Sequence, residues 1–403
     1  MKKLLQINVT ANWGSTGKIA EQIGLKAMEA GWESYIAYGR MMNPSKSKLI
    51  RIGTQSGVYF HYALGRYLDY EGLVSKRATK KFVQEIERIK PDVIHMHNIH
   101  DHFLNYPILF EWISKNDIPV VWSQHDQWAT TGGCCYVPDG CNKWQTGCYE
   151  CPLRKGAKID RSKKNYSLKK EYFTAIKSLT LVPVSEWLGG MMKESFLGKS
   201  DIIVIHNGID INTFHPTVAD IHRKYNIEGK KIILGVASEW SERKGLPDML
   251  KLANLLPKDD YAIVIVGKIL KKMTLEEDKG CPIVFIDRTQ NVQELAKLYS
   301  AASVFVNPTY QDNYPTTNLE AMACGTPVIT YRTGGSPEAV SGETGQVVEQ
   351  GNLLSLVEAV KVVCGCDKDT YTGECRKRAE SCFDKEICFD KYIEIYKELL
   401  RNV

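Results

Sequence analysis

Short β-branched runs alternate with stretches of helical spacing along most of this 403-residue chain. Such alternation is typical of βαβ units, which build parallel sheets covered by helices. The pattern therefore predicts an α/β fold. The expected strands are 4–9, 34–38, 93–97, 120–125, 181–185, 202–206, 232–237, 262–266, 283–286, 304–307 and 328–331. The expected helices are 19–30, 80–89, 246–256, 292–302, 353–363 and 383–401.

This number of strands exceeds what one doubly wound sheet usually holds, so we expect two Rossmann-like domains. The break is placed near residue 185. The expected parts are a first domain over 1–185, a second domain over 186–381 and a last helix over 382–403.

The apolar runs of the chain are all strand-sized, and none approaches the ~20 residues of a transmembrane helix. The first residues resemble a signal peptide only briefly, because Gln6 and Asn8 interrupt the apolar stretch. We interpret them as a first strand, and this interpretation predicts a cytoplasmic protein.

Charge is divided unevenly along the sequence. Residues 1–185 hold 26 Lys and Arg against 16 Asp and Glu, a net charge of +10. The remaining 218 residues hold 26 against 31, a net charge of −5. The first half would suit an anionic partner such as nucleic acid, a membrane surface or a phosphorylated substrate. An uneven solvated surface is the alternative.

A glycine-containing turn follows the first expected strand and directly precedes a helix. It reads Thr-Ala-Asn-Trp-Gly14-Ser-Thr-Gly17-Lys-Ile. Gly14 and Gly17 would let the backbone approach a ligand, and the helix N-terminus offers free N–H groups to a phosphate. The spacing matches neither the dinucleotide fingerprint nor the P-loop. A tight turn without a ligand is the alternative interpretation.

The stretch 304–338 predicts a strand, a loop, a helix, a Gly-Thr-Pro turn and a further strand. Pro315 suits the start of the helix, where its missing N–H would be unpaired anyway. The amides of Thr316, Thr317 and Asn318 would then point toward an anion.

Two carboxylates flank this loop and helix start. Glu320 lies one turn into the helix, on a face that can reach ribose hydroxyls, and Asp312 lies eight residues before it. A carboxylate at each end, with anion-binding amides between them, suits a nucleotide-sugar site.

Four motifs occur in order through the second half of the chain. They are Asn207-Gly-Ile-Asp-x3-Phe-x-Pro216, Lys244-Gly245, Asp312-x7-Glu320 and Gly325-Thr-Pro-Val-Ile329. These motifs resemble those of glycosyltransferase family 4, in which the third reads Glu-x7-Glu. The resemblance covers almost the whole chain and implies the GT-B architecture, with two facing Rossmann-like domains and a cleft between them.

Two positions depart from the family pattern. Asp312 replaces the usual first Glu, which shortens the side chain that would contact the donor sugar. Ser238 stands where an Arg usually precedes the lysine by six residues, and Arg243 is the expected substitute as a diphosphate partner. Arg288, after the strand 283–286, is expected to lie in the loop that frames the donor base.

The resemblance implies that the first domain binds the acceptor and the second binds the sugar nucleotide, with the helix 382–403 crossing back onto the first domain. The family transfers its sugar with retention of anomeric configuration. Lys244, Arg243, the helix amides and the Gly14–Gly17 loop would stabilise the leaving diphosphate, so no metal cofactor is required for catalysis. The expected catalytic residues are His125, Lys244, Asp312 and Glu320.

His125 directly follows an expected strand, and in the family a histidine at this place lies near the donor sugar. A core or capping histidine is the alternative. The cluster His95-x-His97-x2-His100-Asp101-His102 also follows a strand, and we interpret it as structural or acceptor-side rather than metal-binding.

Five of the 12 cysteines fall between residues 134 and 151. Cys134, Cys141, Cys148 and Cys151 have the spacing of a structural zinc site, and Cys135 could replace Cys134. The surrounding insertion, 130–170, lacks the periodicity of strand or helix until about residue 167. Zinc is the favoured hypothesis, whereas thiols without metal and disulfides in an oxidising compartment are the alternatives.

Basic stretches at 76–81 and 154–170 suit anionic lipid or a lipid-diphosphate acceptor better than nucleic acid, for which no recognition module is visible. Solvated helix faces are the alternative.

The resemblance as a whole implies a retaining glycosyltransferase that moves a sugar from a nucleoside-diphosphate sugar to a hydroxyl of a glycan or lipid-linked glycan. Capsule, exopolysaccharide or lipopolysaccharide biosynthesis is the expected setting, at the cytoplasmic face of the plasma membrane. A sugar-nucleotide epimerase of the same architecture, or a zinc-stapled protein that binds anionic lipid or nucleic acid, is the alternative.

Overall fold

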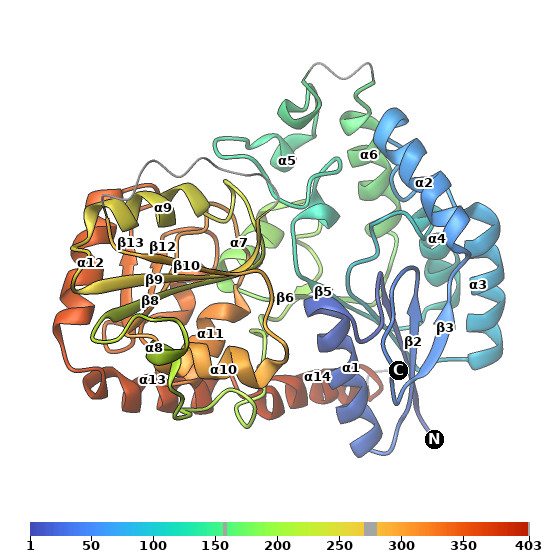
Figure 1. The fold of residues 1–403 in the computed structure, drawn as a ribbon. Helices are drawn as coiled ribbons and strands as arrows, with labels where there is room; N and C mark the ends of the chain where they lie inside the picture. Colours follow the sequence, from blue (N-terminus) through green and yellow to red (C-terminus); the bar gives the residue numbers. More distant parts are fainter. Residues whose placement is uncertain (156–158, 270–279, 402–403) are drawn as a thin grey trace. The chain divides into compact units, whose positions relative to one another are not determined.

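The computed structural model describes residues 1–155, 159–269 and 280–401 (Figure 1). The chain forms two compact units. Unit 1 consists of Met1–His206 with Cys388–Val403, and unit 2 consists of Asn207–Ile387. Each unit contains one parallel sheet, and the predicted α/β fold class is therefore confirmed.

The sheet of unit 1 has the order β3-β2-β1-β4-β5-β6-β7, and all its strand pairs are parallel. Its strands are β1 Lys3–Asn8, β2 Glu33–Tyr38, β3 Lys48–Arg51, β4 Val93–Met96, β5 Val120–Gln124, β6 Leu179–Pro183 and β7 Asp201–Ile202. Its helices are α1 Gly14–Glu29, α2 Gln55–Leu68, α3 Lys76–Ile89, α4 Tyr106–Asn116, α5 Lys143–Thr146, α6 Ser162–Phe173, α7 Glu186–Glu194 and most of α14 Lys385–Leu399.

The core of unit 1 is built on both faces of this sheet because adjacent strand residues point to opposite sides. Val121 packs in the cluster that includes Ile23 of α1 and Tyr396 of α14. The next residue, Trp122, contacts the other layer, with its ring 5.6 Å from that of Phe110 and 5.0 Å from that of Phe173.

The sheet of unit 2 has the order β10-β9-β8-β11-β12-β13 and is also parallel. Its strands are β8 Lys231–Trp240, β9 Tyr261–Ile269, β10 Ile283–Ile286, β11 Val304–Asn307, β12 Val328–Tyr331 and β13 Gly345–Val348. Its helices are α8 Ile221–Lys224, α9 Leu246–Leu255, α10 Val292–Ala301, α11 Thr316–Ala323, α12 Leu353–Gly365 and α13 Asp369–Cys382. In Figure 1, α9 and α12 cover one face of this sheet and α10, α11 and α13 lie on the other.

The boundary between the units follows His206, not residue 185 as the sequence suggested. The short strand β7 pairs with β6, and the amide of Ile205 still donates to the carbonyl of Pro183 at 3.2 Å. The segment after β6 is therefore part of the first sheet.

Unit 2 also extends beyond the expected end at residue 381. The amide of Ile209 donates to the carbonyl of Phe383 at 2.8 Å, and the amide of Lys385 donates back to Ile209 at 2.9 Å. Lys385 Nζ also lies 2.7 Å from Asp210 Oδ2, the aspartate of the Asn207–Pro216 motif. Unit 1 thus takes up the last helix only from Cys388 onward.

Within the described parts of the chain, no helix combines the length and the hydropathy needed to cross a bilayer.

Candidate active site

The strand order of each sheet reverses at one point. In unit 2 this point lies between β8 and β11, and in unit 1 between β1 and β4. Ligands of open α/β sheets bind outside the carboxyl ends of the strands at such points. The segments that follow these four strands carry most of the residues selected from the sequence.

Lys244 follows β8 and reaches the loop after β11. Its Nζ lies 2.5 Å from Asp312 Oδ2, and both side chains are mostly buried. The neighbouring Arg243 holds the same loop, because its Nη1 donates to the carbonyl of Gln311 at 2.9 Å. The two cations are therefore anchored beside the switch point of the unit 2 sheet.

Gly245 is required by this arrangement. Its φ of +76° lies in the left-handed region, and a Cβ there would stand 2.0 Å from the carbonyl oxygen of Pro308. Any larger residue would push Lys244 away from the loop that carries Asp312.

α11 begins where the sequence predicted, with Pro315 in the N-cap position. Thr316 and Thr317 are partly exposed, whereas Asn318 is buried. The amide of Asn318 donates to the carbonyl of Pro315 at 3.2 Å. An anion at this helix end would therefore use the amides of Thr316 and Thr317, and the Asn318 amide is already engaged.

The side chain of Asn318 stabilises the local fold. Its Oδ1 accepts a hydrogen bond of 2.8 Å from Asn307 Nδ2, at the end of β11. This bond ties the start of α11 to the strand before it.

Glu320 is positioned by Tyr299 of α10. The Tyr299 hydroxyl donates to Glu320 Oε2 at 3.0 Å. Burial, together with the neighbouring Glu320 carboxylate, raises the pKa of Tyr299 well above its usual range. Tyr299 therefore stays a hydroxyl donor, and one Glu320 oxygen has a fixed position. The sequence did not predict this partner.

Ser238 and Arg288 are both exposed. The ladder between β8 and β9 is irregular from Val236 to Glu239, and Ser238 lies within this bulge. Arg288 lies two residues beyond the end of β10. No contact in the described part of the chain joins Ser238 or Arg288 to Lys244 or Asp312.

The turn after β1 closes on itself. The amide of Asn12 donates to the carbonyl of Gly17 at 3.1 Å, and Thr10 Oγ1 donates to the carbonyl of Trp13 at 2.7 Å. Gly14 is exposed at φ +66°, whereas Gly17 is buried and a Cβ there would stand 2.7 Å from Thr10 Oγ1. Gly14 can thus face a ligand, while Gly17 is needed for packing.

His125, just after β5, belongs to a chain of polar side chains. Its Nε2 lies 3.2 Å from His97 Nδ1, and His97 Nε2 lies 3.0 Å from Gln6 Oε1. Gln6 Nε2 donates to the carbonyl of Ala20, which leaves Gln6 Oε1 as the acceptor. His97 Nε2 therefore carries the proton and His97 Nδ1 accepts from His125 Nε2–H. In the neutral His125 ring, Nδ1 is then a hydrogen-bond acceptor.

A second chain supports His95 below this site. Tyr396 of α14 donates its hydroxyl to His95 Nδ1 at 2.6 Å, and His95 Nε2 donates to Ser123 Oγ at 2.8 Å. The Ser123 hydroxyl in turn donates a hydrogen bond of 3.0 Å to the Tyr392 hydroxyl. His95 and His97 are fully buried, so the interpretation of the first part of this histidine cluster as structural agrees with the contacts.

These histidines are uncharged at neutral pH. Burial away from water lowers the pKa of His95 and His97 well below their ordinary value and lowers the pKa of His125 to about 4. His125 can therefore accept a hydrogen bond but holds no positive charge near pH 7.

The five clustered cysteines are free thiols, and the disulfide alternative is not realised. Cys134, Cys148 and Cys151 line one cavity of about 210 Å³. In the described residues, however, no three of the predicted ligands Cys134, Cys141, Cys148 and Cys151 form a group compact enough to hold one ion. The positions of the four cysteines therefore do not support the predicted zinc site, which stays a prediction.

The prediction that the basic stretch 154–170 lies on the surface is wrong for Lys169, which is buried. It is only 2% exposed, and its Nζ donates to the carbonyl of Trp128 at 2.6 Å and lies 3.5 Å from the centre of the Trp128 ring. Two arginines of the same stretch are also engaged, since Arg161 stacks on Tyr70 and Arg154 pairs with Asp69. Lys158 lies outside the described residues. The exposed lysines of α6 are Lys163, Lys164 and Lys170.

Two family models together match most of the chain. The model described as Glycosyltransferase Family 4 matches residues 28–213, and the model described as Glycosyl transferases group 1 matches residues 218–377. One curated relative is the putative colanic acid biosynthesis glycosyl transferase WcaC of Escherichia coli (strain K12). It is 23% identical, with 98% of this chain and all of the relative covered.

Two solved structures illustrate the similarity in fold. Sucrose-phosphate synthase from Thermosynechococcus elongatus superposes with a TM-score of 0.72 at 18% identity, with both chains fully covered. HepE of Anabaena, solved in complex with UDP-glucose, superposes with a TM-score of 0.66 at 14% identity, again with full coverage of both chains. The two parallel sheets, the strand orders and these matches agree: the chain is a glycosyltransferase of the family 4 and group 1 type, built on the GT-B fold.

Proposed function

We propose that this glycosyltransferase transfers a sugar, with retention of anomeric configuration, from a nucleoside-diphosphate sugar to a hydroxyl of a glycan or lipid-linked glycan. Assembly of a bacterial surface polysaccharide is the proposed setting, in keeping with the assignment of WcaC to colanic acid biosynthesis. The observation that carries the proposal is the Lys244–Asp312 pair beside the N-terminus of α11, at the switch point of the unit 2 sheet.

The donor diphosphate would bind next to Lys244 and Arg243. Negative charge gathers on the leaving diphosphate as the glycosidic bond breaks, and fixed cations lower the energy of that state. The amides of Thr316 and Thr317 add the positive end of the α11 dipole. This proposal requires no metal ion on the diphosphate.

Glu320 would bind the ribose of the nucleotide. Tyr299 fixes one of its oxygens, so the carboxylate keeps one orientation when a ribose hydroxyl approaches. Gly14 of the β1–α1 turn, Ser238 at the β8 bulge and Arg288 after β10 are proposed as further donor contacts, because each is exposed at the carboxyl end of a strand.

Asp312 is proposed to orient the donor sugar and not to attack it. A double displacement would need a carboxylate nucleophile at the anomeric carbon. The charge of Asp312 is already compensated by Lys244 at 2.5 Å, which reduces the nucleophilicity of the carboxylate. We therefore favour front-side displacement. The bond from the acceptor oxygen to the anomeric carbon forms, the bond to the phosphate oxygen breaks, and the acceptor proton passes to that phosphate oxygen.

His125 is proposed to contact the transferred sugar. The hydrogen-bond chain through His97 makes Nδ1 the accepting nitrogen of the His125 ring, and a sugar hydroxyl can donate to a nitrogen of this kind. Because His125 is uncharged near neutral pH, it would orient the sugar without opposing positive charge at the anomeric carbon.

The acceptor is proposed to carry a lipid diphosphate, held by unit 1 at an anionic membrane. A cavity of about 720 Å³ lies between α2 and α3, and its lining is mainly apolar. The lining also includes three basic side chains, those of Lys76, Arg77 and Lys81. Positive charges therefore lie next to the apolar part of the cavity. α2 also exposes Phe60 and Tyr67, with 61% and 76% of their surface accessible. Aromatic and basic residues side by side suit a membrane interface.

A thermal-shift screen of nucleoside diphosphates and sugar nucleotides tests the donor proposal. A ligand at 100 times its dissociation constant stabilises its protein by about 2.7 kcal/mol. The wild-type protein should respond to one class of nucleotide, and Glu320→Gln should need on the order of tenfold more of it, because a charged hydrogen bond is lost. Glu358→Gln, on the exposed side of α12, is the matched control. No response to any nucleotide would contradict the donor site.

A further inference from the structure

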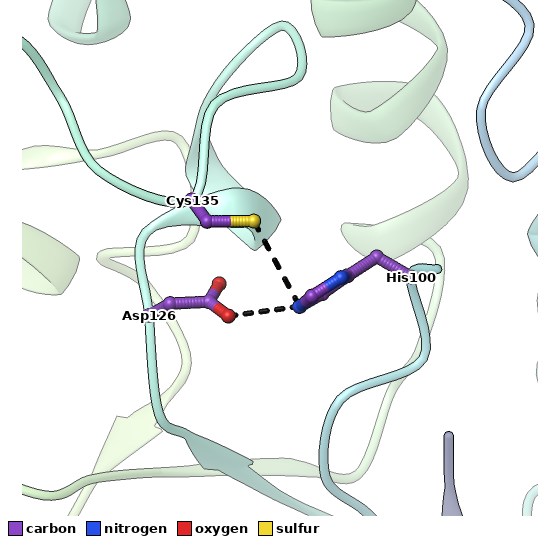
Figure 2. Close-up of side chains that lie close together, drawn as sticks. All are labelled: His100, Asp126 and Cys135. Atoms are coloured by element: carbon purple, nitrogen blue, oxygen red, sulfur yellow. Dashed lines mark hydrogen bonds and ion pairs between the residues drawn. The ribbon is translucent and has the colours of Figure 1, made fainter. Parts of the chain in front are cut away.

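Three side chains of unit 1 meet beyond the carboxyl ends of β4 and β5. Figure 2 shows Asp126 and Cys135 directed at the same ring nitrogen of His100. His100 Nε2 lies 2.8 Å from Asp126 Oδ2 and 3.9 Å from Cys135 Sγ. Across the residues that the structure describes, this is the one group of three or more potential ligands whose atoms all lie within 4.8 Å of one another.

The three groups are the ligand types that zinc prefers. An imidazole nitrogen, a thiolate and a carboxylate oxygen all bind Zn²⁺ at about 2.0–2.3 Å. In a tetrahedral site such bonds separate N from O by about 3.3 Å and N from S by about 3.5 Å. The observed separations differ from these values by about half an ångström or less, a change that side-chain rotation can supply.

A neighbouring group already orients one of the ligands, and a carboxylate lies near another. Asp126 Oδ1 accepts the backbone N–H of Trp128 at 2.9 Å, which leaves Oδ2 directed at His100. On the other side of the ring, His100 Nδ1 lies 4.0 Å from Glu71 Oε1. A carboxylate on this side of the ring is the usual outer partner of a metal-bound imidazole, and Glu71 would need to move closer to hydrogen-bond Nδ1.

An ion pair between His100 and Asp126 would satisfy those two residues without a metal, but it would not account for Cys135. Cys135 Sγ lies 3.9 Å from the same ring nitrogen, and the ion pair does not require it there. None of the three residues is completely buried.

We propose that His100, Asp126 and Cys135 bind one divalent ion of the zinc class. The ion would join the glycine-rich segment after Thr130 to the ends of β4 and β5. Three protein ligands leave a fourth position for water or for an oxygen of a bound molecule. The proposal is independent of the transferase activity, and it replaces the four-cysteine site with a different ligand set.

Cobalt titration of the metal-stripped full-length protein tests this assignment. About one equivalent of Co²⁺ should produce a thiolate-to-metal charge-transfer band and the intense visible bands of tetrahedral cobalt, and Zn²⁺ should abolish both. Cys135→Ser should remove the charge-transfer band, and His100→Gln should weaken cobalt binding at least tenfold, the scale of losing a ligand or its support. Cys148→Ser is the matched control and should keep the band.

X-ray absorption on the zinc-loaded wild-type protein gives a second readout that does not depend on how variants fold. One sulfur among nitrogen and oxygen ligands is the expected first shell. A shell of four sulfurs, or a cobalt band lost in Cys148→Ser and kept in Cys135→Ser, would overturn the assignment in favour of the four-cysteine site. Absence of binding at one equivalent of Co²⁺ or Zn²⁺ would show that the group is an ion pair only.

Discussion

The ammonium of Lys244 lies 2.5 Å from the carboxylate of Asp312, although 68 residues separate them in the chain. The pair joins the segment after β8 to the loop after β11, the two strands between which the order of the sheet reverses. A cation and a carboxylate are thus in contact at the place where we propose that the glycosidic bond of the nucleotide sugar breaks. Removing either partner should have a distinct kinetic effect.

Lys244→Ala should lower turnover about 10²–10³-fold, the cost of losing one preorganised charge-stabilising group. Binding of the nucleoside diphosphate product should also weaken, because product and transition state share the diphosphate charge. Steady-state kinetics and calorimetric titration measure the two effects. Lys251→Ala removes an exposed lysine of α9 and should change neither. Full turnover in Lys244→Ala would refute the placement of the donor site.

His125→Ala should have the opposite distribution of effects. Its proposed contact is to the sugar, so turnover should fall while affinity for the nucleoside diphosphate stays near the wild-type value. His206→Ala, at the end of unit 1, is a control for the loss of a partly exposed imidazole. Equal losses in turnover and in diphosphate affinity would mean that His125 supports the fold and not the sugar.

We expect His61 to make the stability of unit 1 sensitive to acid. It is buried on α2, where its Nε2 accepts the amide N–H of Gly72 at 3.1 Å. Burial lowers its pKa to about 4 in the folded protein, against an ordinary value of 6.5. Between these two pKa values His61 is protonated in the unfolded chain but neutral in the folded chain. The free energy of unfolding should therefore decrease as pH falls from about 6.5 toward 4.

Urea unfolding at several pH values, followed by tryptophan fluorescence, measures this effect. Seven of the eight tryptophans precede residue 207, so the signal reports mainly on unit 1. His61→Gln should reduce the slope of unfolding free energy against pH by up to about 1.4 kcal/mol per pH unit in this window. His222→Gln, in unit 2, should leave the slope unchanged. An unaltered slope in His61→Gln would show that His61 is not held neutral.

Membrane association should depend on α2 and α3. Sedimentation with vesicles should increase with the fraction of anionic lipid and decrease with added salt, since exposed charges are screened over about 8 Å at physiological ionic strength. Lys76→Glu with Lys81→Glu should weaken binding, and Phe60→Ser should weaken it further by removing an exposed apolar ring. Lys361→Glu with Lys377→Glu makes the same charge change in unit 2 and should have no effect. Equal binding to neutral vesicles would contradict the electrostatic part of this prediction.

The sequence predicted those parts of the molecule whose pattern is local. The long buried strands β8 and β9 have continuous apolar runs, and Pro315 marks the start of α11. The edge strands β3 and β13 were missed because only two of the four residues in each are apolar, Leu49 and Ile50 in β3 and Val347 and Val348 in β13. Their pairing is decided by the neighbouring strand and not by their own composition.

The errors at the site arise from contacts between distant residues. Lys169 belongs to a basic run in sequence, but its ammonium is buried against Trp128, 41 residues away. The spacing within 134–151 identifies Cys135 only as a substitute for Cys134, because spacing does not reveal that His100 and Asp126 lie beside it. The same holds for Gln6, whose role depends on His97, 91 residues further on.

The stereochemical proposal makes the sharpest prediction for Asp312. Asp312→Asn keeps the shape of the side chain but removes the charge that pairs with Lys244, so turnover should fall about tenfold while the product keeps the configuration of the donor. If Asp312 were the nucleophile of a double displacement, the amide could not form the covalent intermediate, and turnover would fall far more steeply. Product analysis by NMR on the wild-type enzyme tests the outcome directly. Retention in both proteins, with substantial activity left in Asp312→Asn, fits front-side displacement. An inverted product would require a general base at the acceptor and would overturn the mechanism proposed for Asp312 and His125.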